Sequence, residues 1–139
     1  MKIISQEDSR YILRFDRGEE LLAALAAWCG TNKIGAATLS GIGAAGEIVL
    51  AYYNLETKEY ENHTITEDLE IISLLGNVAL FDARPLIHLH GSFGDKNLQI
   101  RGGHVRKLLV SATLELAVQT YAQSIQRRHD ATTGLNLLS

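Results

Sequence analysis

The sequence has only one cysteine and one proline among its 139 residues. The single cysteine, Cys29, excludes an internal disulfide and fits a reducing compartment. No apolar run approaches the roughly 20 residues that a membrane-spanning helix needs. The first ten residues, MKIISQEDSR, also lack an apolar stretch of signal-peptide length. These absences predict a soluble, cytoplasmic protein with no membrane partner.

Positive charge and aromatic side chains are scarce as well. The formal net charge is −3, and aromatic residues make up 6% of the chain. Proteins that bind nucleic acid on their own usually carry a basic surplus, because neutralising phosphates supplies most of the affinity. The one tight basic cluster is Arg127-Arg128, and Arg106-Lys107 is a weaker pair. The composition therefore argues against autonomous binding of DNA or RNA.

The hydrophobic share of 46% suits one domain with its own core, which we take as residues 1–139. One helix is clear, because the run EELLAALAAWCG places Leu21, Leu25 and Trp28 on a common face. Asp16 and Glu19 have the spacing of a capping box at its start. Gly30 is the expected end of this helix, and Cys29 is expected to pack in the core.

The rest of the chain has the alternation and turn residues of β-strands. The tail, residues 126–138, mixes charged and apolar residues and is assigned no element, and its RRHD segment is interpreted as solvated. The pattern predicts an α+β fold of the α/β-sandwich type, a mostly antiparallel β-sheet with a few helices packed on it. The expected strands are residues 10–15, 36–40, 47–54, 59–65, 69–75 with 78–81 as a continuation, 85–90 and 105–121.

Residues 40–46 read SGIGAAG and contain the spacing G-x-G-x-x-G of a dinucleotide-binding turn. That interpretation requires a helix to begin at the glycines, whereas the next residues, EIVLAYYN, are rich in strand formers. We therefore interpret the segment as a glycine-rich turn or bulge between two strands, where close packing leaves no room for side chains.

The strongest candidate for chemistry is the pair His88 and His90. Residues two apart on a strand share one face, and a hairpin over 91–103 would bring His104 beside them. Three neutral imidazoles with an open fourth position are typical of a catalytic-type zinc site. The alternative is that two half-buried histidines bond to the backbone and that His104 is an unrelated loop residue.

Several acidic residues and histidines have two interpretations. Asp95 is either a fourth metal ligand or a turn residue, and the turn is favoured. Glu70 and Glu115 fall within apolar strands, so they are expected to need a partner, and either could serve as a general base near the histidines. His63 and His129 are expected at the surface.

Taken together, the segments of this chain resemble the PPC (plants and prokaryotes conserved) domain family over about residues 11–138. The resemblance implies a compact domain on a largely antiparallel sheet, a homotrimer, and a stand-alone prokaryotic member. It also implies that His88, His90 and His104 form a metal site, with zinc as the expected ion, and that SGIGAAG is a turn. The matching segments are RGEELLAAL, LSGIGAAGE, YYNLETKEY, EDLEIISLLGNVAL, RPLIHLHGSFGD, GGHV and RRHDATTGLNLL.

In plants the PPC domain follows AT-hooks, so the resemblance also implies association with DNA or with other proteins. This chain has no R-G-R-P stretch, and the plant contact motif G-R-F-E-I-L is replaced by EDLEII at residues 67–72. Three hypotheses follow for its function: a trimeric, metal-containing binding or scaffolding protein, a DNA-associated protein, and a metalloenzyme or small-ligand-binding protein that uses the open metal position.

Overall fold

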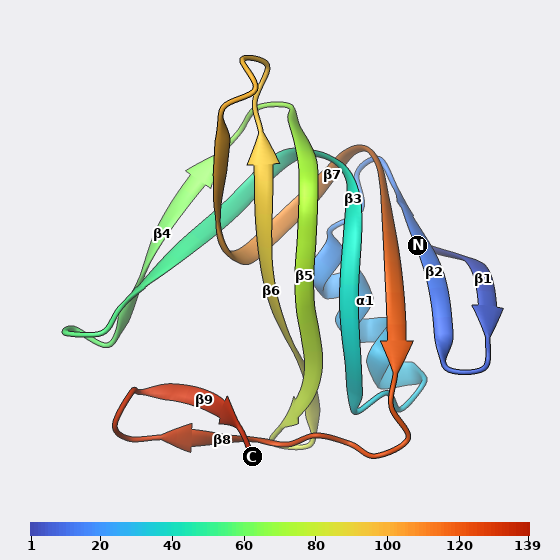
Figure 1. The fold of residues 1–139 in the computed structure, drawn as a ribbon, viewed down its shortest axis with the longest axis vertical. Helices are drawn as coiled ribbons and strands as arrows, with labels where there is room; N and C mark the ends of the chain where they lie inside the picture. Colours follow the sequence, from blue (N-terminus) through green and yellow to red (C-terminus); the bar gives the residue numbers. More distant parts are fainter.

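Two long strands run through the sheet and organise the fold (Figure 1). In the computed structural model, which describes all 139 residues, these are β3 (Ala36–Asn54) and β7 (Ile100–Thr120). They pair antiparallel with each other, and each also pairs with further strands. The other strands of this sheet are β1 (Lys2–Glu7), β2 (Arg10–Asp16), β4 (Glu59–Ile65), β5 (Leu69–Phe81) and β6 (Arg84–Gly94).

The sheet has the strand order β1-β2-β7-β6-β5-β3-β4, with β7 and β3 paired in addition. The pairings therefore close a circuit from β3 through β5, β6 and β7 back to β3. Every pairing within it is antiparallel, as the sequence predicted. The tail forms a separate hairpin of β8 (Arg127–Asp130) and β9 (Leu135–Leu138), which the sequence did not indicate and which lies at the foot of Figure 1.

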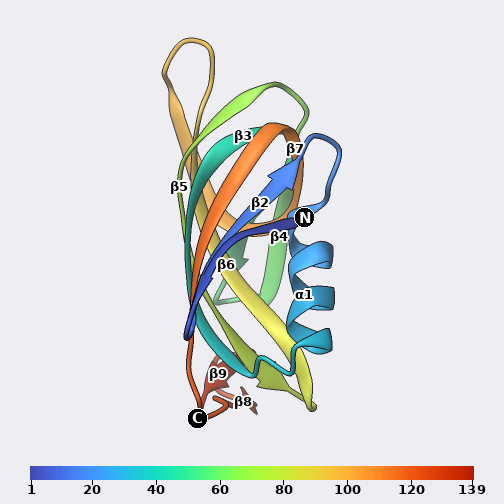
Figure 2. The ribbon, with the colours of Figure 1, turned by 90° about the vertical axis from the view of Figure 1, so that its right-hand side faces the viewer.

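The helix α1 (Leu21–Thr31) packs on one side of the sheet, against β6 and β7 (Figure 2). It is the one helix of the structure, where a few were expected, and its 11 residues are too few to cross a membrane. The predicted apolar face is confirmed, because Leu21, Leu25, Trp28 and Cys29 are all buried. Burial raises the pKa of the Cys29 thiol to about 11, which fits a packing role.

The capping of α1 differs from the expected box. Glu20 is the N-cap, and its carboxylate accepts from the backbone N–H groups of Leu22 at 3.1 Å and Ala23 at 2.7 Å. Asp16 cannot cap the helix because it is still paired within the sheet, opposite Thr113. The reciprocal half of the box is present, since the Glu19 carboxylate accepts from the Asp16 N–H at 2.7 Å.

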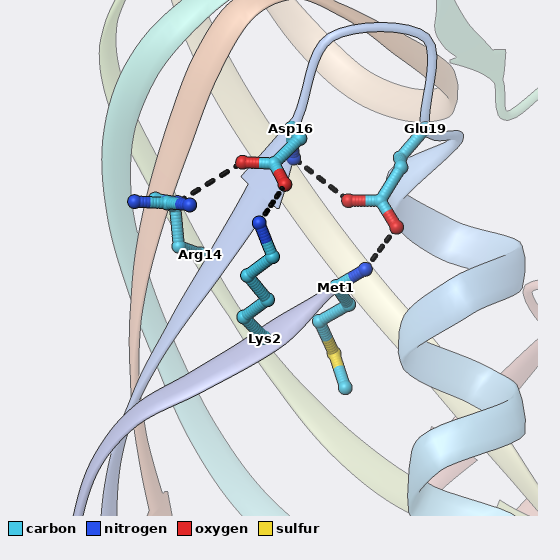
Figure 3. A network of polar contacts seen from close by, with 5 residues as sticks. All are labelled: Met1, Lys2, Arg14, Asp16 and Glu19. Atoms are coloured by element: carbon cyan, nitrogen blue, oxygen red, sulfur yellow. Dashed lines mark hydrogen bonds and ion pairs between the residues drawn. The ribbon is translucent and has the colours of Figure 1, made fainter.

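A network of charges ties the N-terminal strand to this helix start (Figure 3). The amino group of Met1 donates to Glu19, and Lys2 and Arg14 pair with the Asp16 carboxylate at 2.7 and 3.0 Å. These contacts lower the pKa of Glu19, mainly through the Met1 amino group, and the pKa of Asp16, mainly through Lys2. Charged carboxylates at both positions therefore stabilise the folded state.

This network predicts a loss of thermal stability in acid. A carboxylate with a lowered folded-state pKa stabilises the protein above its unfolded pKa, and that contribution disappears as the pH falls through the folded value. The melting temperature should fall below pH 4.5, the ordinary pKa of Glu19, and fall less steeply in Glu19→Gln. Glu56→Gln, which changes an exposed turn residue without an ion pair, should keep the parent profile. Identical profiles for all three proteins would contradict the prediction.

The glycine segment 40–46 is a bulge inside one continuous strand, so the expected turn between two strands is wrong. The register with β5 shifts between Gly41 and Gly43, which confirms the expected bulge. A Cβ on Gly43 would lie 2.3 Å from the carbonyl oxygen of Thr113 on β7, and Gly43 has a φ of +151°. The glycines serve the close approach of two strands, and no helix follows them to hold a nucleotide phosphate.

Two further expectations about strand boundaries change with the structure. Residues 69–75 and 78–81 join into β5, because the chain passes through Gly76 without leaving the sheet. The hairpin expected over 91–103 is narrower, since β6 extends to Gly94 and β7 begins at Ile100. Asp95 accepts from the N–H groups of Asn97 at 2.8 Å and Gln99 at 3.1 Å, which confirms it as a turn residue.

Candidate metal centre

The hairpin of β6 and β7 brings three histidines to one place. His88 and His90 lie two apart on β6, with the fully buried Leu89 pointing to the opposite face between them. His104 on β7 lies directly opposite His90 in the strand register. The narrow turn between the strands therefore sets the position of the third imidazole.

The geometry of the three imidazoles suits a single small ion. The Nε2 atoms of His88 and His90 are 3.2 Å apart, and one ring nitrogen from each of the three residues lies within 4.8 Å of the others. Zinc–nitrogen bonds of 2.0–2.1 Å in a tetrahedral site separate neighbouring nitrogens by about 3.3 Å. The first pair already has this separation, and the ligand nitrogen of His104 lies within 4.8 Å of both.

The protonation of these histidines also suits a metal. Burial lowers the pKa of His104 to about 4, with further lowering from the charges of His88 and His90. The pKa of His88 is lowered as well, first by burial and then by the Arg127 guanidinium. Both imidazoles are therefore neutral near pH 7, which is the form that binds a metal ion.

Arg127 on β8 is a residue of this site that the sequence did not single out. Its guanidinium donates through Nη1 to the Asn136 carbonyl oxygen at 2.7 Å and through Nη2 to Asn77 Oδ1 at 2.8 Å. Nη2 also lies 3.4 Å from Nδ1 of His88. Arg127 is only 9% exposed, whereas Arg128 is exposed, so the expected basic cluster is divided between interior and surface. No local pattern indicated this division, because all four residues of RRHD are polar.

The histidines open into a cavity of about 550 Å³ between the sheet, α1 and the β8–β9 hairpin. Arg106 lies over the ring of Tyr60 at 5.0 Å, and that ring is 5.2 Å from the ring of His104. No aspartate or glutamate lines the cavity. The lining residues are Leu22, Tyr60, Leu86, Ile87, His88, His90, His104, Val105, Arg106, Arg127, Gly134, Leu135, Asn136 and Leu137.

The two glutamates considered as general bases lie away from this cavity. Glu70 and Glu115 are both exposed, so the expectation that they need a partner within an apolar strand is wrong. Each points away from its buried neighbours to the solvent-facing side of its strand, and neither is among the residues that line the cavity. His63 and His129 are exposed, as expected. Of the predicted site residues, the structure brings together only His88, His90 and His104.

Several solved structures match the chain over nearly its whole length, and three of them are at least 30% identical to it. A metal-containing protein from Archaeoglobus fulgidus is 34% identical, with a TM-score of 0.87 over 100% of this chain and 99% of that one. A plant- and prokaryote-conserved (PPC) protein from Pyrococcus horikoshii is 32% identical, with a TM-score of 0.86 over 94% and 90% of the two chains. A "putative DNA binding protein" from Bacteroides thetaiotaomicron is 30% identical, with a TM-score of 0.94 over 97% and 94%.

At the level of sequence, the profile of the Plants and Prokaryotes Conserved (PCC) domain matches residues 4–122. This span contains β2 to β7 and all three histidines of the cluster. No curated protein sequence matches the chain. The β8–β9 hairpin, which supplies Arg127, follows the matched span.

Proposed function

The chain belongs to the Plants and Prokaryotes Conserved domain family, and we propose that it is a metal-containing member in which His88, His90 and His104 hold a zinc ion. The observation that carries this proposal is the convergence of three ring nitrogens within 4.8 Å at a cavity. The metal-containing relative from Archaeoglobus fulgidus supports it. We take residues 1–139 as one domain, because the hairpin beyond the matched span completes the same cavity.

A zinc ion with three protein ligands would supply a Lewis-acidic centre with one open coordination position. The side chains of this chain would hold the ion, shape the cavity around it and place Arg127 and Arg106 beside it. No carboxylate is present there to act as a general base. The cavity therefore favours the binding of a small ligand over hydrolysis, with metalloenzyme activity as the alternative.

Elemental analysis tests the metal proposal directly. Protein purified without a metal-affinity tag should contain about one zinc per chain, since one set of three histidine ligands is present. Dialysis against a chelator followed by zinc should restore the same ratio. A protein that retains no metal after zinc has been offered would contradict the proposal.

We also propose that the protein is a homotrimer that associates through the uncovered face of the sheet. Apolar and small side chains form a row across four strands there, because Ser40 lies opposite both Leu75 and Ala117, and Ala117 lies opposite Ile12. Leu75 is 63% exposed and Ile12 is 42% exposed. Ile42 lines a groove together with Ile12, Leu75 and Ala117 of this row. An exposed strip of apolar and small side chains of this kind is typical of a subunit interface.

The trimer proposal predicts that Leu75→Glu abolishes association. A buried, unpaired carboxylate at the contact would oppose the burial of the apolar strip, so the mass in light scattering should fall from that of three chains to that of one. Leu55→Glu is the matched control, because Leu55 is 67% exposed in a turn outside the strip. A monomeric parent protein, or a trimeric Leu75→Glu variant, would contradict the proposal.

DNA association is a second candidate function, supported by the name of the Bacteroides thetaiotaomicron relative. The net charge of −3 gives no basic surplus for phosphate contacts, and Arg127 of the one tight basic cluster is buried. A salt-dependent shift of duplex DNA at micromolar protein would support this function. The absence of a shift at low salt would contradict it.

A further inference from the structure

Arg127 carries a buried positive charge without an anionic partner. The side chain is 9% exposed, and none of the ion pairs in the protein includes it. Its Nε is buried and donates to no acceptor, and its other donors contact only neutral groups of Asn77, Asn136 and His88. Buried guanidinium groups normally pair with a carboxylate or a phosphate, because an uncompensated buried charge is strongly unfavourable.

The cavity around Arg127 selects further for negative charge. Arg106 lines the same cavity, and no acidic side chain does. A low-dielectric pocket lined by charges of one sign concentrates ligands of the opposite sign. A zinc ion on the three histidines would increase this preference.

The apolar residues that line the rest of the cavity make a purely polar anion a poor fit. Leu22 of α1, Leu86 and Ile87 of β6 and Leu135 of β9 contribute apolar surface to the cavity. A volume of about 550 Å³ is in the range of pockets for small organic molecules. A ligand that suits both the positively charged part and the apolar part of the cavity therefore has one anionic end and an apolar body.

We propose that this cavity binds a small organic carboxylate, with its carboxylate paired to Arg127 and its apolar part against the leucines of α1, β6 and β9. The planar guanidinium fork matches the two carboxylate oxygens, which a single ammonium would not. This inference rests on the proposed function insofar as a zinc ion adds positive charge to the same cavity. The charge of Arg127 is independent of the metal.

Calorimetric titration tests the inference with a series of straight-chain carboxylates from acetate to octanoate. Hexanoate should bind to the zinc-loaded protein at least about tenfold more tightly than its neutral isostere hexanamide, and more tightly than acetate or inorganic phosphate. Arg127→Gln should weaken hexanoate binding by about tenfold or more. Arg128→Gln, an equal charge change at the exposed neighbour, should leave hexanoate binding unchanged.

The metal content of every sample separates this inference from the proposed function. Protein that contains zinc but binds hexanoate no better than hexanamide would overturn the carboxylate site and leave the metal site standing. Zinc-free protein that still prefers hexanoate, and loses the preference in Arg127→Gln, would support the carboxylate site without the metal. Preferential binding of phosphate would overturn the organic class. If Arg127→Gln does not fold, two other measurements decide the question. They are the hexanoate affinity of Arg127→Lys and the relative affinity of the parent protein for hexanoate and hexanamide.

Discussion

A variant with both His88→Ala and His90→Ala should contain no zinc after purification, whereas the parent protein should contain about one zinc per chain. The double change removes two of the three nitrogen ligands, so the affinity should fall by at least about a thousandfold. Both side chains lie at the cavity and outside the main core cluster, so the fold should survive the change. Elemental analysis measures the zinc content, and far-ultraviolet circular dichroism measures whether the fold is retained.

The matched control for this variant is the pair His63→Ala and His129→Ala. It also removes two histidines, but both are exposed and neither belongs to the cluster. The control should keep the zinc content of the parent. Equal zinc in both double variants would place the metal elsewhere, and the absence of zinc from the parent would make the three histidines structural.

Gly43→Ala should lower the free energy of unfolding by about 4 kcal/mol, an effect at the upper end for single substitutions. The added Cβ would lie 2.3 Å from the Thr113 carbonyl oxygen and 2.7 Å from Leu114 Cα, and both atoms belong to the backbone of β7. A backbone in a paired strand cannot move aside as a flexible side chain can. The bulge of β3 would have to open, and the central pairing of β3 with β7 would weaken.

Gly30→Ala is the control, because it is the same chemical change in the opposite environment. Gly30 lies near the end of α1, and a Cβ there would meet no atom within 4 Å. Alanine has a higher helix propensity than glycine, so the free energy of unfolding of this variant should exceed that of the parent by about 0.5 kcal/mol. Urea unfolding of the three proteins at one protein concentration measures both effects. A Gly43→Ala midpoint equal to that of the parent would show that β3 and β7 can separate at no cost.

The local elements of this protein could be predicted from its sequence, because they depend on short-range periodicity. Alternation along the chain indicated the strand that became β2, and EYENHTI became β4 with the predicted bounds. The apolar spacing of Leu21, Leu25 and Trp28 indicated the buried face of α1. The pair His88 and His90 shares a face for the same reason, since side chains two apart on a strand point the same way.

Only the tertiary structure determined the contacts between segments that lie far apart in the chain. The bulge at Gly43 exists because β7 passes within a side chain's width of β3, and no local pattern distinguishes that bulge from a turn. Glu115 proved to be exposed because its strand has a solvent-facing side. Arg127 is buried because the terminal hairpin folds over the histidines. The sequence alone presented Arg127 as a surface charge, because this packing joins segments far apart in the chain. Strand and helix therefore follow from neighbouring residues, whereas the charge inside the cavity follows from how the terminal hairpin packs on the main sheet.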